Sequence, residues 1–389
     1  MEEWKKYKMG DFIDFNPTIS LKKGTVARKI TMDKLIPHSR DIYDWEYEQY
    51  SGGAKFQNGD TIMARITPCL ENGKHAYISL LDDGETAYGS TEYIVMRGIP
   101  GVSDNRFVYY LSHFPDFKNA AVKSMVGSSG RQRAQVDVLK NLEFYLPGLE
   151  EQRKIADTLS SLDDKIALNN RINHNLEEQT QSLYKSWFID FLPFSNCRLI
   201  NSEIGPIPEG WSVTNLLDVA SLYDSKRKPL SGKERDQMAK RYPYYGATSV
   251  MDYVDNYIFD GTYLLMGEDG SVMTENGFPY LQYVTGKFWP NNHAHVMQGK
   301  NGFSTELLHC ALLRKVIKPS VTGAVQAKIS QANMRKILFP CPPKTILREF
   351  DTIIQKIYDE KRSIESQNST LSMIRDNMLP QLMSGQITI

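Results

Sequence analysis

Two short loops combine glycine with basic and amide side chains, the combination needed to contact a polyanion. They are VGSSGRQR, residues 126–133, and SVTGAVQAK, residues 320–328. Glycine lets the backbone approach phosphates closely, while arginine, lysine and glutamine neutralise charge and donate hydrogen bonds to phosphates or base edges. We therefore predict nucleic-acid contacts in the first loop for Ser128, Ser129, Gly130, Arg131, Gln132 and Arg133, and in the second for Thr322, Gly323, Gln326 and Lys328.

Further candidates lie outside these loops. Arg65 and Lys74 flank a TPCLENG turn and have side chains suited to phosphate contact. Tyr244 and Tyr245, in a tyrosine-rich stretch, either contact sugar or base or form the packing surface of a β-sheet. Both alternatives stay open.

The charge distribution supports this chemistry, although the formal net charge is zero. No acidic residue lies between Glu306 and Glu349, or between Asp116 and Asp137, while lysines and arginines occur in both stretches. One such stretch is usually a solvated surface, but two in corresponding places indicate local basic faces.

Other chemistries find little support. An adenine methyltransferase would carry an NPPY-like tetrapeptide and a glycine-rich cofactor loop, and the sequence has neither. His293 and His295 form an HxH pair, but alternating histidines on a strand usually divide between core and surface, so we predict no metal. The Gly267–Gly270 segment, GEDG, is interpreted as a turn. The four scattered cysteines indicate free thiols with a packing role, and the absence of an 18-residue apolar run predicts a cytoplasmic protein.

Short β-like segments and one long helix must position these loops. Strands are predicted at Thr61–Ile66 and Glu92–Met96, a helix at Asn105–Phe114, and a long helix at Leu149–Phe191. The layout then repeats, ending in a second long helix at Lys344–Leu379. We predict an α+β protein with a first head (1–147), a helix (148–192), a linker and second head (193–343) and a final helix (344–389).

The two long helices carry matching apolar seams with steps of three and four, as a coiled coil requires. The seam residues are Ile155, Leu159, Leu162, Ile166, Leu176 and Leu183 in the first helix, and Phe350, Ile354, Ile357, Ile364, Leu371 and Met378 in the second. Asn169 and Asn173 interrupt the first seam and would fix its register. The helices are expected to pair antiparallel and hold two heads apart; alternatively, each packs only on its own head.

The chain resembles the specificity subunit of Type I restriction-modification enzymes over nearly its whole length. The resemblance rests on LPGLEEQRKIADTLSSLDDKI after the first head, IPEGW opening the second, YPYYGATSVMDYVDNYIFDGTYLLMGEDG and NNHAHV inside it, VTGAVQAKIS near its end and the closing NMLPQLMSGQI. One departure is the start of the second helix, KTILREF, which lacks a counterpart of Glu151-Gln152.

The resemblance implies two mixed α/β target recognition domains, each reading half of a bipartite asymmetric site in double-stranded DNA. It implies that the helices dock two modification subunits and that restriction subunits join a larger complex. The chain itself would be non-catalytic and without a cofactor, because S-adenosylmethionine binds the modification subunit, where a flipped adenine is methylated at N6. Two alternatives remain: an enzyme with a diverged nuclease or methyltransferase site, and a coiled-coil assembly protein without a role on DNA.

Overall fold

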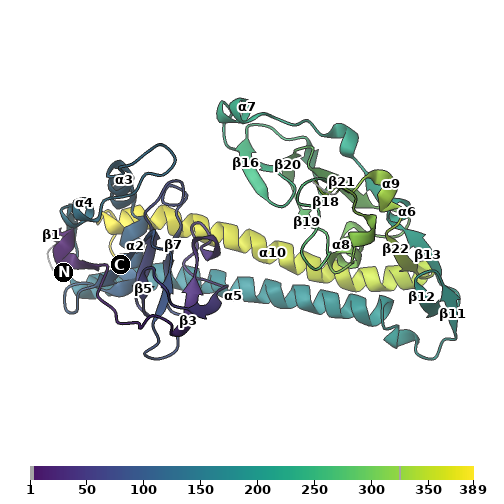
Figure 1. The fold of residues 1–389 in the computed structure, drawn as a ribbon, viewed down its shortest axis with the longest axis horizontal. Helices are drawn as coiled ribbons and strands as arrows, with labels where there is room; N and C mark the ends of the chain where they lie inside the picture. The colour runs from purple at the N-terminus through teal and green to yellow at the C-terminus, as the bar shows by residue number, and fades with distance from the viewer. Residues whose placement is uncertain (1–3, 324–325) are drawn as a thin grey trace. The chain divides into compact units, whose positions relative to one another are not determined.

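The computed structural model describes residues 4–323 and 326–389, so two residues of the second glycine loop lie outside the described residues. The chain divides into two compact units (Figure 1). Unit 1 comprises Met1–Arg171 and Ile364–Ile389, and unit 2 comprises Ile172–Ser363. Each unit contains one head and part of each long helix.

The head of unit 1 contains two four-stranded sheets, in the orders β2-β9-β6-β7 and β4-β3-β8-β5, and a strand pair β1-β10. Its strands are β1 (Lys5–Lys8), β2 (Ile13–Phe15), β3 (Val26–Ile30), β4 (Glu46–Gln49), β5 (Lys55–Phe56), β6 (Thr61–Ala64), β7 (His75–Tyr77), β8 (Ala87–Gly89), β9 (Tyr93–Gly98) and β10 (Glu143–Leu146). Its helices are α1 (Met9–Phe12), α2 (Asn105–His113), α3 (Pro115–Lys123) and α4 (Val136–Lys140).

The head of unit 2 repeats this topology strand for strand, in the orders β14-β21-β18-β19 and β16-β15-β20-β17, with the pair β13-β22. Its strands are β13 (Ser212–Asn215), β14 (Ala220–Leu222), β15 (Tyr242–Tyr245), β16 (Val250–Val254), β17 (Phe259–Asp260), β18 (Tyr263–Gly267), β19 (Leu281–Val284), β20 (Lys287–Pro290), β21 (Ala294–Gly299) and β22 (Leu338–Cys341). Its helices are α6 (Leu216–Val219), α7 (Gly232–Asp236), α8 (Thr305–Leu313) and α9 (Gln331–Met334), and a hairpin of β11 (Leu199–Ser202) and β12 (Gly205–Pro208) precedes it. The predicted repeat is therefore confirmed.

Local sequence explains where the elements begin. Asp104 caps α2, because its carboxylate accepts hydrogen bonds from the backbone N–H groups of Arg106 and Phe107. Ser304 caps α8 in the same way. Both helices bury most of their residues, so each belongs to the core of its head.

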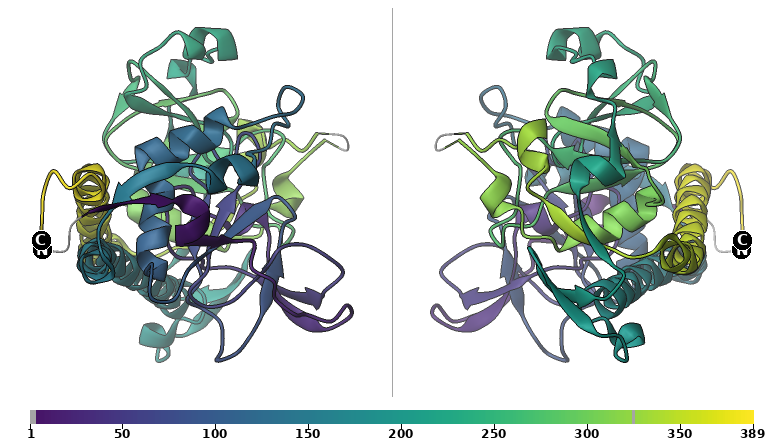
Figure 2. Two further views of the ribbon diagram at one scale, coloured as in Figure 1. Left: turned by 90° about the vertical axis from the view of Figure 1, so that its left-hand side faces the viewer. Right: turned by 90° about the vertical axis from the view of Figure 1, so that its right-hand side faces the viewer.

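The two long helices are α5 (Leu149–Phe188) and α10 (Lys344–Met383), each 40 residues long. Within each unit they lie side by side (Figure 2). They run antiparallel, because residues further along α5 meet residues earlier in α10, such as Asn169 with Asn368 in unit 1 and Tyr184 with Phe350 in unit 2. In unit 1, Asp163 of α5 pairs with Arg375 of α10 at 2.6 Å. In unit 2, Glu177 of α5 lies 3.5 Å from Lys361 of α10. The predicted antiparallel helices are thus confirmed.

The predicted seam is buried only in part. Ile155, Leu159, Phe350, Ile354 and Ile364 are at most 3% exposed. The remaining seam residues are partly buried: Leu162, Ile166, Leu176, Leu183, Ile357, Leu371 and Met378. Several buried seam residues belong to the same apolar cores as the heads. Each helix therefore packs both on a head and on the other helix, so the two predicted arrangements, helix pairing and packing on a head, occur together.

The polar interruption of the seam also has a defined role. Asn169 is 1% exposed and donates a hydrogen bond to the side-chain oxygen of Asn368, while Asn368 donates to Asn170; both distances are 2.8 Å. This network links α5 and α10 within unit 1 and favours one register, as expected. The side-chain oxygen of Asn173 has no hydrogen-bond partner among the described residues.

The first turns of the two long helices are anchored differently. Gln152 of α5 is fully buried, donates to the carbonyls of Val102 and Pro147 at 3.0 and 2.9 Å, and accepts from the N–H of Asp104 at 2.9 Å. Leu347 lies in the corresponding turn of α10, is 2% exposed and belongs to the apolar core. The departure in KTILREF therefore replaces a polar anchor with an apolar one.

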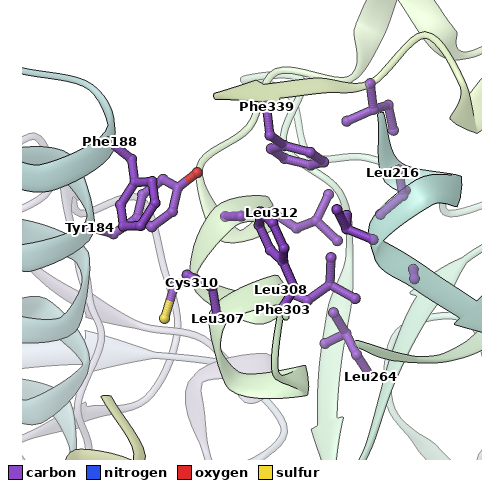
Figure 3. Packing of buried hydrophobic residues seen from close by; sticks show 14 of the residues in the cluster. Tyr184, Phe188, Leu216, Leu264, Phe303, Leu307, Leu308, Cys310, Leu312 and Phe339 are labelled. Carbon is purple, nitrogen blue, oxygen red and sulfur yellow. The ribbon is translucent and has the colours of Figure 1, made fainter. Parts of the chain in front are cut away.

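Figure 3 shows the core of unit 2, where Tyr184 and Phe188 of α5 approach residues of α8 and β22. Cys310 of α8 lies in this core, and burial raises the pKa of its thiol to about 12. All four cysteines are free, as predicted, but Cys197 is exposed and so does not have the packing role that we expected. Among the described residues, no helix is both long enough and apolar enough to cross a bilayer.

Candidate nucleic-acid interface

The first glycine loop forms an exposed β-hairpin. Val126 and Arg133 exchange backbone hydrogen bonds of 3.1 and 3.0 Å, and the residues between them turn through Gly127 and Gly130, which both have positive φ. Positions 127–131 are all exposed. Arg131 makes no ion pair with any described residue, so its guanidinium is available to a ligand.

Arg133, at the base of this hairpin, is held by an acidic side chain that the sequence analysis did not select. The carboxylate of Glu92 accepts from Arg133 Nε at 2.9 Å and from Nη2 at 2.6 Å. The hydrogen bonds from Arg133 lower the pKa of Glu92. Arg65 is adjacent, because its N–H donates to the Glu92 carbonyl at 2.9 Å and its carbonyl accepts from the N–H of Ala134 at 2.8 Å. The structure therefore brings Arg65 and Arg133 together.

Lys74 is directed elsewhere: its ammonium group donates to the carbonyl of Met32 at 2.8 Å. It is only partly exposed. Its contact with nucleic acid stays a prediction.

The second glycine loop forms the equivalent hairpin in unit 2. Thr322 and Lys328 exchange backbone hydrogen bonds of 2.8 and 2.7 Å. Gly323 has φ +96°, and a Cβ there would lie 2.0 Å from the carbonyl oxygen of Gln326, so this turn requires glycine. Thr322, Gly323, Gln326 and Lys328 are exposed. Lys328 lies 3.5 Å from the carboxylate of Glu268.

The tyrosines divide between the two alternatives. Tyr244 is 2% exposed, its hydroxyl accepts from the N–H of Leu230 at 2.9 Å, and the Arg235 guanidinium lies 5.0 Å from its ring centre. This burial corrects the prediction that Tyr244 contacts nucleic acid: the ring packs within its sheet. Tyr245 is partly exposed and packs its ring edge-on against Phe288.

The GEDG segment does more than turn the chain. Glu268, Asp224 and His295 place ligand atoms within 4.8 Å of one another, a cluster that the sequence analysis did not anticipate. However, Arg227 donates to Glu268 at 2.7 Å and lies 3.7 Å from Asp224. The arginine therefore supplies the positive charge that a cation would bring.

The two histidines of HxH divide as predicted. His295 is 1% exposed and bridges Asp224 and the carbonyl of Ile329, whereas His293 is exposed and bonds to Asp269. Burial opposes ionisation of Asp224, but hydrogen bonds from His295 and from the Val296 N–H outweigh it and lower its pKa. The cluster is thus a set of ion pairs beneath the second hairpin.

The acids Glu92 and Glu268 were missed because they are distant in sequence from the basic residues with which they pair. Glu92 precedes β9 and is 41 residues from Arg133. Only the strand register brings them together. The signal present in the sequence was the position of each acid at the end of a predicted strand.

Comparison with known proteins identifies the family. The pattern described as "Type I restriction modification DNA specificity domain" matches residues 1–178 and 208–370. A chain of Haemophilus influenzae, described as "Putative type I restriction enzyme specificity subunit S.HindORF215P", is 35% identical over 150 residues, which cover 39% of this chain and 37% of that relative. The MjaIX specificity subunit of Methanocaldococcus jannaschii is 26% identical over 90% of this chain and 86% of its own.

A solved structure shares the fold. The crystal structure of a Type-I restriction-modification system S subunit from M. genitalium superposes with a TM-score of 0.53 at 16% identity, covering 98% of this chain and 96% of that one. The relatives are specificity subunits, a non-catalytic class, in agreement with the prediction for this chain. Since the family pattern matches most of the sequence, the chain belongs to the family of Type I restriction-modification DNA specificity domains.

Proposed function

We propose that the chain is the DNA-reading subunit of a Type I restriction-modification complex and that its two heads read the two halves of a bipartite asymmetric site. The observation that carries this proposal is the repetition of an exposed, basic glycine hairpin, Val126–Arg133 and Thr322–Lys328, on two heads of the same topology. Basic side chains neutralise phosphates, and side chains beside them read base edges. Because the hairpin sequences differ, the half-sites differ.

The long helices are proposed to dock two modification subunits, with restriction subunits joining the larger complex. The helices keep large apolar side chains exposed, namely Leu168, Ile353, Met373 and Ile374. Such side chains suit a protein interface better than water. S-adenosylmethionine would be bound by the modification subunits, where a flipped adenine is methylated.

The experiment is a selection from a random DNA duplex library with the complex of this chain and its modification subunits. We expect two short conserved blocks of different sequence, separated by a spacer of fixed length and no preference. One contiguous block, or no enrichment, would contradict the proposal. Methylation by the isolated chain with S-adenosylmethionine would instead support the enzyme alternative.

A further inference from the structure

The base of each hairpin meets the sheet at a junction of three residues, and the backbone hydrogen bonds of the two junctions correspond one to one. In unit 1, Ala134 N–H donates to the Arg65 carbonyl at 2.8 Å and Arg65 N–H to the Glu92 carbonyl at 2.9 Å. In unit 2, Ile329 N–H donates to the Glu268 carbonyl at 2.9 Å and Glu268 N–H to the His293 carbonyl at 2.8 Å. The reading junction is therefore Arg65, Glu92 and Arg133 in head one, and Glu268, His293 and Lys328 in head two.

The side chains of this junction differ between the two heads, although the backbone hydrogen bonds are the same. Where head one has the basic Arg65, head two has the acidic Glu268, and where head one has the acidic Glu92, head two has His293. The third position keeps its charge but changes from Arg133 to Lys328. Since one backbone accepts both sets, the fold does not dictate these side chains, and their difference points to the ligand.

The accessibility of the junction fits a ligand contact. The side chains of Arg133, His293 and Lys328 are 42%, 47% and 52% exposed. Each is at the same time held by an acid: Arg133 by Glu92, His293 by Asp269 and Lys328 by Glu268. Side chains that are exposed but oriented lose little conformational freedom when they bind.

The geometry of head one favours one base. Glu92 binds Nε and Nη2 of Arg133, and Nη1 donates a long hydrogen bond of 3.4 Å to the Arg131 carbonyl, so the planar guanidinium is fixed. Nη1 and Nη2 each carry a second N–H, and these two N–H groups form the edge directed away from the carboxylate. An arginine edge donates two parallel hydrogen bonds to O6 and N7 of guanine in the major groove. Lysine can also donate to these atoms, but its ammonium group sits on a flexible stem and lacks the planar fork that Glu92 orients, so it makes this pair with poorer geometry.

We propose that this junction determines the sequence that each head reads. Arg133, positioned by Glu92, selects a guanine in the first half-site. The different side chains at the junction of head two select a different base at the corresponding position of the second half-site. This inference rests on the proposed function, because it requires that the heads bind DNA bases. It assigns Glu92 the role of a positioning residue.

The decisive variants are Arg133→Lys, which keeps the charge but removes the planar fork that Glu92 orients, and Arg133→Ala, which removes both. The assembled complex is passed through the random-duplex selection, and the preference for guanine at each position of the first half-site is measured. We expect Arg133→Lys to lower the preference at one position about tenfold or more while the second half-site is read unchanged. The unchanged second half-site also shows that the complex is assembled and folded.

Arg106→Lys is the matched control, since Arg106 of α2 is likewise partly exposed, at 38%, and held by an acid, Asp157 at 2.7 Å, but lies outside the hairpin and the reading junction. It is expected to leave every base preference as in the wild type. Glu92→Ala should lower the same guanine preference, and adding it to Arg133→Lys should cause no further loss. If Glu92→Ala instead lowers the affinity equally for all DNA sequences, Glu92 does not position Arg133 for base readout.

The two hypotheses fail in distinguishable ways. If the wild-type complex selects no bipartite site, the proposed function is wrong. If it selects one and both Arg133→Lys and Arg133→Ala retain every preference of the wild type, the function stands and the reading junction is refuted, because Arg133 would then act only as a charge near phosphate.

Discussion

The buried ion pair of unit 1 allows a quantitative test of how α5, α10 and α2 are held together. Asp163 of α5 is 3% exposed; one oxygen accepts from Arg375 of α10 and the other from the hydroxyl of Tyr110 of α2, both at 2.6 Å. Removal of one partner of a buried pair typically costs about 3–5 kcal/mol, because the remaining charge is left uncompensated. Asp163→Ala would leave Arg375 with Asp376 at 2.8 Å and Tyr110 with Ser160 at 3.3 Å. We therefore expect the lower end of that range, about 3 kcal/mol.

The double variant Asp163→Leu with Arg375→Met tests the same reasoning from the opposite side. Replacing both charges by apolar side chains removes the desolvation cost together with the attraction, so its stability should lie within about 1 kcal/mol of the wild type or above it. The control is Asp157→Ala, which removes an exposed pair with Arg106 and should change stability by at most about 0.5 kcal/mol.

These variants are measured by urea unfolding, with hydrogen exchange of the α2 amides as a separate report on unit 1. Mutual compensation of the two buried charges is refuted if Asp163→Ala costs less than about 1 kcal/mol, or if the double variant is as unstable as the single one. The second result would mean that the site needs its charges for packing geometry and not for mutual compensation.

Three further predictions concern single residues. His309 is buried, and burial lowers its pKa from 6.5 to about 3, so the folded state favours the neutral ring. Its contribution to the free energy of unfolding is therefore fully present above pH 6.5, and it should fall by about 2 kcal/mol by pH 5, because the ring is then protonated only in the unfolded chain. The urea midpoints above pH 6.5 and at pH 5 should therefore differ less in His309→Gln than in the wild type. In the control His174→Gln, which changes an exposed histidine, they should differ as much as in the wild type. Gln152→Ala should cost about 2–3 kcal/mol in urea unfolding, because it leaves a buried N–H and buried carbonyls unpaired; a loss below about 0.5 kcal/mol would contradict this anchor. Gly323→Ala should weaken DNA binding by the complex more than Gly130→Ala, whose Cβ meets open space; equal binding constants in a titration would show that hairpin shape is unimportant.

Helix and strand positions could be predicted because they depend on local periodicity. The helix expected at Asn105–Phe114 is observed at Asn105–His113, and the strand expected at Thr61–Ile66 is observed at Thr61–Ala64. The expected helix end at Leu379 was wrong by a few residues: α10 continues through Pro380 to Met383. Leu382 and Met383 are buried in the core of unit 1, and this packing outweighs the helix-breaking tendency of proline.

The candidate site was predictable only as far as its loops. Glycine and basic residues mark both hairpins in the sequence, but the partners of Arg133 and Lys328 come from other strands. The pairing of β6 with β9, and of β18 with β21, places Glu92 and Glu268 beside the hairpins. Tyr244 illustrates the opposite limit, because a tyrosine that looks suited to stacking on a base is buried within its sheet. No local pattern distinguishes such a ring from an exposed one.

The different anchors at Gln152 and Leu347 have a consequence for building hybrid proteins. A graft that places head one before α10 would leave the carbonyl of Val102 and the N–H of Asp104 facing Leu347, which offers them no hydrogen bond. The reverse graft would bury the amide of Gln152 among the apolar side chains around Leu347. A functional chimera must therefore move each head together with the first turn of the helix that follows it, so the natural module for exchange ends inside the helix and not at the head boundary.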